Sequence, residues 1–121
     1  MVTKEKKCSI LIAENDQDLL NCLRRYFKDN YRVTTFFQRE DIIRHAPSAH
    51  FLLLESRLVM IYGFNFLEQI IKAAEDIAII IMGDIRPGSE EERSILTNTV
   101  TKVLSKPFEP KEIESIIGDC S

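Results

Sequence analysis

Residues 51–55, Phe-Leu-Leu-Leu-Glu, form a short apolar run that ends abruptly at a carboxylate. A strand that is apolar on both sides belongs in the middle of a sheet whose two faces are covered. The runs at residues 8–13 and 77–82 predict two further buried strands of the same kind. Open α/β sheets place their ligand or reaction site at the carboxyl ends of such strands, so we expect Glu55 to project into a crevice there.

Amphipathic segments alternate with the strands along the chain. Apolar residues at three- and four-residue spacing predict helices between residues 15 and 29, over 38–45 and 64–74, from the Ser89 cap to about Asn98, and from 109 to 117. Residues 31–35 alternate in polarity, which indicates an edge strand, and residues 100–104 predict a short last strand. Five strand–helix alternations predict a doubly wound parallel sheet: a flavodoxin-like (βα)5 fold with strand order 2-1-3-4-5. The domain should span residues 8–118, between an N-terminal tail (1–7) and a C-terminal tail (119–121).

Composition excludes several classes of function. With 45% apolar and 29% charged residues among 121, the chain is typical of one globular domain. A net charge of −3 provides no basic stripe, so we expect no direct nucleic-acid binding. No run is long enough for a transmembrane helix and no signal-peptide pattern is present, so we expect no membrane contact. Cys8, Cys22 and Cys120 lack metal-ligand spacing, and we expect reduced packing thiols in a cytoplasmic protein.

The predicted topology gathers polar residues from distant positions at one edge of the sheet. The first, third, fourth and fifth strands end at Glu14-Asn15, Glu55, Gly83 and Ser105-Lys106. Four segments then carry a family resemblance: Ile-Leu-Ile-Ala-Glu-Asn-Asp (10–16), the run at 51–55, Gly-Phe (63–64) and Leu-Ser-Lys-Pro-Phe (104–108). Over almost its whole length the chain resembles the receiver domain of two-component response regulators. The resemblance implies a cis peptide bond between Lys106 and Pro107.

The resemblance also implies a phosphorylatable switch for signal transduction. In such domains an aspartate at the end of the third strand accepts a phosphoryl group from a histidine kinase. Two acidic residues after the first strand hold Mg²⁺, which offsets the repulsion between carboxylate and phosphate. A Ser or Thr after the fourth strand and a lysine after the fifth bind the phosphoryl oxygens. An aromatic residue on the fifth strand then reorients and exposes a new surface.

The chain departs from this pattern at most of the functional positions. Glu55 occupies the phosphoacceptor position, and the acidic pair consists of Glu14 and the neutral Asn15. Gly83 occupies the position of the hydroxyl residue, and Val103 occupies the position of the switch aromatic. Glutamate carries its carboxylate about 1.5 Å further out than aspartate. A misplacement of roughly 1 Å can cost about a hundredfold in rate. We therefore expect an inactive acceptor, no catalytic residue, and at most weak Mg²⁺ binding by Glu14, Asn15 and Glu55.

Lys106 alone is unaltered, and we expect it to neutralise charge rather than to catalyse. Glu55 facing Lys106 is either a built-in mimic of the phosphorylated state or an ion pair retained from a lost activity. We favour the retained ion pair, because Gly83 and Val103 lack the groups that would respond to the charge.

The apolar run from Leu58 to Tyr62 is predicted to be a loop beside the pocket, either folded over it as a plug or exposed as a contact patch. In the family, the face formed by the fourth helix, fifth strand and fifth helix binds targets or dimerises; here these are residues 90–98, 101–104 and 111–117. The leading hypothesis is a non-enzymatic pseudo-receiver that contacts a histidine kinase, an output domain or a second copy of itself. The alternatives are an active phosphoacceptor with unusual chemistry and a small-ligand-binding flavodoxin-like module; the absence of a glycine-rich loop after the first strand counts against the latter.

Overall fold

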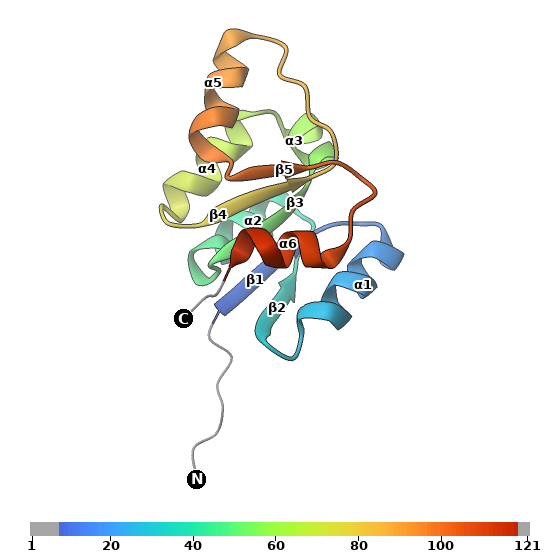
Figure 1. Cartoon of the computed structure of the whole chain (residues 1–121). Coiled ribbons are helices and arrows are strands. Elements are labelled where there is room, and N and C mark those ends of the chain that lie inside the picture. The colour runs from blue at the N-terminus through green and yellow to red at the C-terminus, as the bar shows by residue number, and fades with distance from the viewer. Residues whose placement is uncertain (1–7, 119–121) are drawn as a thin grey trace.

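The computed structural model describes residues 8–118. Its strands are all parallel and lie in one sheet in the order β2-β1-β3-β4-β5, which confirms the predicted topology (Figure 1). The strands are β1 (Cys8–Ala13), β2 (Tyr31–Thr35), β3 (Phe51–Glu55), β4 (Ala78–Met82) and β5 (Lys102–Leu104). The last of them is shorter than the predicted 100–104, because α5 extends through Thr99.

Helices cover both faces of the sheet (Figure 1). They are α1 (Gln17–Phe27), α2 (Arg39–His45) with the short 3₁₀ helix η1 (Ala46–Ser48), α3 (Ser56–Tyr62), α4 (Asn65–Ala73), α5 (Glu90–Thr99) and α6 (Pro110–Ile117). The buried residues of α1 and α6 pack on one face, and those of α2, α3, α4 and α5 pack on the other.

Alternating side chains of the central strands divide the core into two layers. Ile10 and Ile12 of β1 pack toward α1 and α6, whereas Leu11 between them packs toward the opposite helices. All three are fully buried. Burial of one such side chain stabilises the fold by roughly 1.5–3 kcal/mol, so these runs hold the strand ends in place.

The helix starts agree in part with the sequence prediction. Asp16 caps α1, because its Oδ1 accepts hydrogen bonds from the backbone amides of Asp18 (3.0 Å) and Leu19 (3.2 Å). Ser89 caps α5 by accepting a bond of 3.1 Å from the Glu92 amide. Serine followed three residues later by glutamate is typical of a capping box, in which the glutamate would accept a hydrogen bond from the Ser89 amide. The Glu92 carboxylate instead accepts from the Gly88 amide at 2.7 Å, so only the serine half of this prediction is confirmed.

The segment predicted as an apolar loop is the helix α3. Leu58 and Val59 are 1% and 0% exposed, whereas Met60 and Ile61 are 59% and 69% exposed. The run is therefore neither a plug nor a wholly exposed patch, because the helix directs Leu58 and Val59 toward the core and Met60 and Ile61 toward the solvent. The helical period could not be recognised in the sequence, because all the residues from Leu58 to Tyr62 are apolar.

The cysteines also differ from expectation. Cys8 is buried at the start of β1 and is disulfide-bonded rather than reduced. Cys22 is a free thiol, but it is exposed because it lies on the outer side of α1, between the buried Leu20 and Leu23. Cys120 and both predicted tails lie outside the described residues. Within residues 8–118, the helices are too short and too polar to cross a membrane.

Candidate functional site

The carboxyl ends of β1, β3, β4 and β5 surround a cleft with a volume of about 380 Å³. Parallel strands place these ends at one edge of the sheet, as the sequence analysis predicted. The lining residues include Glu14, Asn15, Glu55, Ser56, Gly83 and Lys106. Val103, predicted at the switch position, does not line the cleft: it is half-buried against the core on the α5 side.

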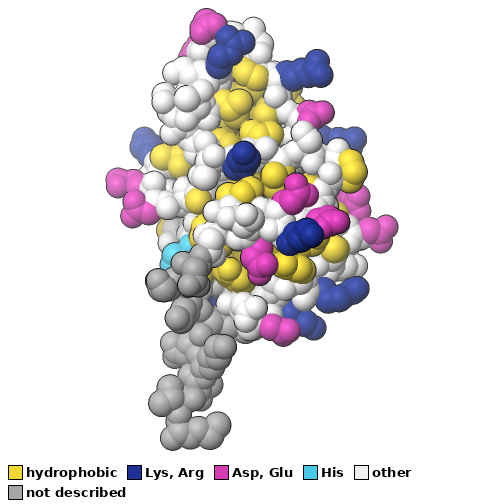
Figure 2. All heavy atoms as spheres, in the orientation of Figure 1, with side chains coloured by type: hydrophobic (Ala, Val, Ile, Leu, Met, Phe, Trp, Pro, Cys, Tyr) yellow, Lys and Arg dark blue, Asp and Glu magenta, His cyan; other side chains and the backbone are white. Residues whose placement is uncertain are grey.

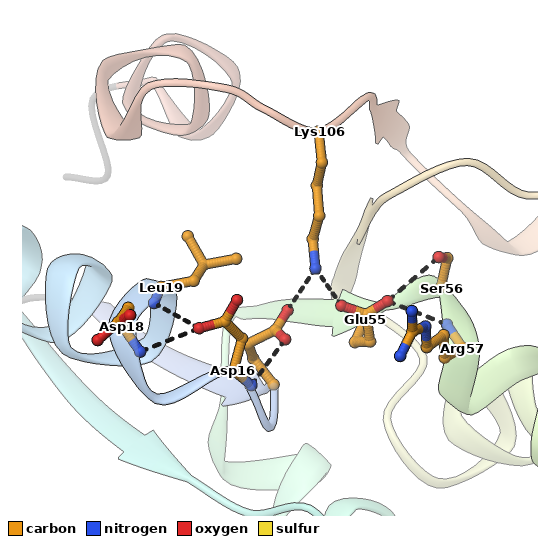
Figure 3. A network of polar contacts seen from close by, with 8 residues as sticks. Asp16, Asp18, Leu19, Glu55, Ser56, Arg57 and Lys106 are labelled. Atoms are coloured by element: carbon orange, nitrogen blue, oxygen red, sulfur yellow. Dashed lines mark hydrogen bonds and ion pairs between the residues drawn. The ribbon is translucent and has the colours of Figure 1, made fainter.

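Lys106 bridges two buried carboxylates across the cleft. Its Nζ donates a hydrogen bond of 3.0 Å to Glu14 Oε2. It donates a second hydrogen bond to Glu55 Oε2, which Figure 3 shows. Glu14 and Glu55 are only 4% and 5% exposed, whereas the lysine side chain is 34% exposed. Buried carboxylates are costly unless they are paired, so the ammonium group is what makes this arrangement tolerable.

The remaining carboxylate oxygens bind groups on their own strand ends. Glu55 Oε1 accepts from the Arg57 amide (3.2 Å) and from Ser56 Oγ (3.3 Å), and so caps α3 (Figure 3). Glu14 Oε1 accepts from the Asp16 amide at 3.1 Å. All four carboxylate oxygens of the pair therefore have hydrogen-bond donors within the protein.

The two carboxyl groups are shifted in opposite directions. Burial raises the pKa of Glu14, and the neighbouring Glu55 carboxyl raises it further. Burial also opposes ionisation of Glu55, but its contacts with Glu14, Lys106 and the Arg57 amide outweigh burial and lower its pKa. Burial similarly acts against the charge on Lys106, yet its bonds to Glu55 and Glu14 raise its pKa. As pH falls, Glu14 thus takes the first proton while Glu55 keeps its charge beside Lys106.

Gly83 sits where a side chain would collide with Ser56. Its φ is +109°, a conformation that residues other than glycine rarely adopt. A Cβ built on Gly83 would lie 2.6 Å from Ser56 Oγ and 3.7 Å from Glu55 Oε1. The Ser56 hydroxyl therefore fills the space that a residue with a hydroxyl would need at position 83.

Comparisons with known proteins assign the family. The family model "Response regulator receiver domain" matches residues 10–118, nearly all of the described chain. The chain belongs to the response regulator receiver domain family. Receiver domains are signalling modules of two-component systems that act with kinases or output domains and often dimerise. Among curated proteins there is no significant match.

Solved structures with the same fold include receiver domains. A CheY-like response regulator receiver domain protein from Methanospirillum hungatei JF-1 has 18% identity and a TM-score of 0.74, covering 91% of this chain and 90% of its own. The N-terminal domain of the nisin resistance regulator NsrR has 19% identity and a TM-score of 0.71, with coverages of 92% and 95%. The beryllofluoride-activated DrrB receiver domain has 18% identity and a TM-score of 0.71, with coverages of 91% and 93%.

The carboxylate oxygens at this site already accept hydrogen bonds from groups of the protein. Mg²⁺ needs a near-octahedral shell of oxygen atoms. Here the Lys106 ammonium already lies between Glu14 and Glu55, and the exposed Asn15 adds no charge. Within residues 8–118, no three acidic, histidine or cysteine side chains are grouped so that they could hold a metal ion. A divalent cation would have to displace the lysine.

One prediction about the backbone of this receiver domain is confirmed, and two features of the site were missed. The peptide bond between Lys106 and Pro107 is cis, as predicted. The bond from Lys106 to Glu14 was not foreseen, because an acidic residue that follows a strand and precedes a helix is also typical of helix capping. The proximity of Ser56 to Gly83 could not be predicted, because it depends on the backbone conformation after β4. The sequence shows only that a serine follows Glu55.

Proposed function

We propose that this receiver domain signals through protein contacts alone, without phosphorylation of Glu55 and without a bound metal ion. The observation that carries the proposal is the position of Lys106 between Glu14 and Glu55. The lysine supplies the positive charge that the site would otherwise take from a divalent cation. The protein thus supplies a counter-charge for the two carboxylates from its own side chains.

The surroundings of Glu55 argue against its acting as a phosphoacceptor. A carboxylate that attacks phosphorus must direct a free lone pair at it, and both oxygens of Glu55 are engaged by Lys106, Ser56 and the Arg57 amide. A carboxylate is already ionised at neutral pH, so the lowered pKa of Glu55 makes it less basic and hence a weaker nucleophile. An approaching phosphoryl donor would also meet Glu14, and one lysine cannot offset both carboxylates and the phosphate.

The same contacts favour one fixed conformation over a two-state switch. Lys106 connects the ends of β1, β3 and β5 through partly buried hydrogen bonds. Val103 is aliphatic and half-buried, so it has no ring whose reorientation could change the surface. A ligand shifts an equilibrium only between states that bind it differently. We therefore regard Glu55 as part of a retained ion pair, and we assign it no role as a mimic of phosphate.

Two surfaces are available for partner contacts. The first is the α5, β5 and α6 face, where Figure 2 shows apolar side chains lying between charged ones. The second is the outward side of α3, with the exposed Met60 and Ile61. A histidine kinase, an output domain or a second copy of the chain would bind there.

Phosphoryl transfer is the test of this proposal. The protein is incubated with acetyl phosphate and Mg²⁺ and followed by intact mass, and beryllofluoride with Mg²⁺ is followed by amide chemical shifts. We expect the mass to stay unchanged and no saturable shifts around Glu55. The Glu55→Gln variant is the matched control. A phosphoryl adduct that forms on the unaltered protein and is lost in Glu55→Gln would overturn the proposal and establish an active phosphoacceptor.

A further inference from the structure

A row of basic side chains lies along the side of α1 that faces the edge of the sheet. Asn21, Arg24 and Lys28 follow the three- and four-residue spacing of one helix face, and Arg25 lies beside them. Together with Tyr31 and Val33 of β2 they line a hollow of about 330 Å³, which we call the basic cradle. The cradle lies away from Glu55, so an inference about it is independent of the function proposed above.

The cations of the cradle are not neutralised by the described part of the protein. Two arginines on other helices pair with acids one helical turn away: Arg44 with Asp41 and Arg93 with Glu90. Within residues 8–118, Arg24, Arg25 and Lys28 make no such ion pair, although Asp29 follows directly. The overall negative charge of the chain makes this local excess of positive charge more conspicuous.

The strand beneath this row of cations is an edge of the sheet. No strand lies beyond β2 in the described chain. The Phe36 amide donates to the Ile12 carbonyl at 3.2 Å, so the even-numbered residues of β2 direct their backbone groups at β1. Alternation then points the backbone amides of Val33 and Thr35 outward. Such an edge accepts an added strand.

The spacing of the cations matches the spacing of side chains on an added strand. Residues four apart on a helix, such as Arg24 and Lys28, are separated by about 6 Å along its axis. Side chains two residues apart on a strand are separated by about 6.7 Å. Acidic residues at alternate positions of a strand paired with β2 would therefore each lie opposite one cation.

We propose that the basic cradle docks an acidic extended segment of another protein, which pairs with the edge of β2. The backbone pairing favours a polypeptide over a nucleic acid, because a nucleic acid has no amide ladder to offer to the strand. The Tyr31 and Val33 side chains give the segment an apolar surface to pack on.

Peptide titrations followed by amide chemical shifts test the proposal. One peptide alternates glutamate with valine and threonine, and a second has the same composition with its glutamates grouped together. We expect the alternating peptide to bind saturably, to shift the amides of Val33 and Thr35, and to bind at least about fivefold more tightly than the grouped one. Added salt should weaken the binding.

Variants connect the binding to the cradle. The double variant Arg24→Gln/Lys28→Gln should weaken binding about tenfold, since it removes two facing charges. Arg32→Gln is the matched control, because Arg32 is exposed on the opposite face of β2 and its loss should change affinity by less than about twofold.

Three outcomes would overturn the inference. The first is equal binding of the two peptides, or binding that is insensitive to Arg24 and Lys28. The second is binding of a single-stranded oligonucleotide as tightly as the alternating peptide, with shifts of the same amides, because this would show that the surface binds polyanions in general. The third is self-association through the same amides, which would assign the edge to a second copy of the chain. The peptide comparison on the unaltered protein decides the question even if the double variant fails to fold.

Discussion

The ammonium group of Lys106 donates a hydrogen bond of 3.0 Å to a carboxylate oxygen of Glu14, a residue 92 positions earlier in the chain. The bond spans the cleft from the end of β1 to the end of β5, two strands that are separated in the sheet by β3 and β4. Lys106 also bonds to Glu55 between them. One lysine thus connects the ends of β1, β3 and β5.

Removal of this lysine should destabilise the domain. Lys106→Met leaves Glu14 and Glu55 buried without a counter-charge, so we expect the free energy of unfolding to fall by about 1–3 kcal/mol at neutral pH. This loss is smaller than for a fully buried ion pair, because the lysine is partly exposed. The measurement is urea unfolding. Lys102→Met is the matched control, because Lys102 is an exposed residue of β5. Equal losses in the two variants would refute the structural role of the bridge.

Neutralising each carboxylate should have opposite effects on stability. The pKa of Glu55 is lowered, so folding favours its charged form, and Glu55→Gln should lower stability at neutral pH by on the order of 1 kcal/mol. The pKa of Glu14 is raised, so folding disfavours its charge, and Glu14→Gln should leave stability unchanged or increase it. Urea unfolding of both variants at pH 7 decides this. A larger loss for Glu14→Gln than for Glu55→Gln would contradict it.

The same two groups set the pH dependence of stability. The contribution of Glu55 is present above its ordinary pKa of 4.5 and is lost as pH falls through its lower folded value. Glu14 acts in the opposite sense: its contribution is present below 4.5 and is lost as pH rises through its raised folded value. Between pH 3 and 7, the unfolding free energy of the unaltered protein should therefore decline on the acid side because of Glu55 and above pH 4.5 because of Glu14. The acid-side decline should be absent in Glu55→Gln, and the decline above pH 4.5 should be absent in Glu14→Gln. Parallel curves for the two variants would exclude this assignment.

Helix α3 gives a prediction about packing. Val59 is fully buried, so Val59→Ala should cost about 1–3 kcal/mol through the cavity it leaves. Met60→Ser and Ile61→Ser alter exposed side chains and should each change stability by less than about 0.5 kcal/mol. Chemical unfolding compares all three. A similar cost at the three positions would mean that this segment does not form the amphipathic helix described here.

The sequence predicted the sheet well because its central strands are short, continuous apolar runs with only one way to be buried. It failed for α3, where apolar residues occupy both sides of a helix of seven residues and no polar spacing reveals its period. At the site, the position of each strand end was predictable from topology. The choice of Glu14 as a second partner of Lys106 was not, since it depends on side-chain reach and on which oxygen the Asp16 amide already uses.

The contact between Ser56 and Gly83 gives a prediction about coupling. Gly83→Ala introduces a Cβ that would lie 2.6 Å from Ser56 Oγ, on a backbone with φ of +109°, and should cost about 2–4 kcal/mol. Ser56→Ala removes the colliding atom, so the double variant should recover about 1 kcal/mol of that loss, the remainder being backbone strain. A double-mutant cycle from urea unfolding measures this. Strict additivity would show that the two positions do not compete for space.

Restoring phosphorylation should depend on the same contact. Glu55→Asp shortens the acceptor, Asn15→Asp supplies a second acidic metal ligand, and Gly83→Thr supplies the hydroxyl that the family uses. Ser56 Oγ occupies the space of the new threonine, so we expect the triple variant to fold poorly or to remain inert. With Ser56→Ala added, the shorter aspartate would release Lys106 to bind phosphoryl oxygens, and Mg²⁺-dependent phosphorylation by acetyl phosphate should appear as a phosphoryl mass gain. The matched control carries Glu55→Asn in place of Glu55→Asp and should gain nothing. A folded quadruple variant that stays unphosphorylated would place the block elsewhere, with α3 beside the cleft as the next segment to alter.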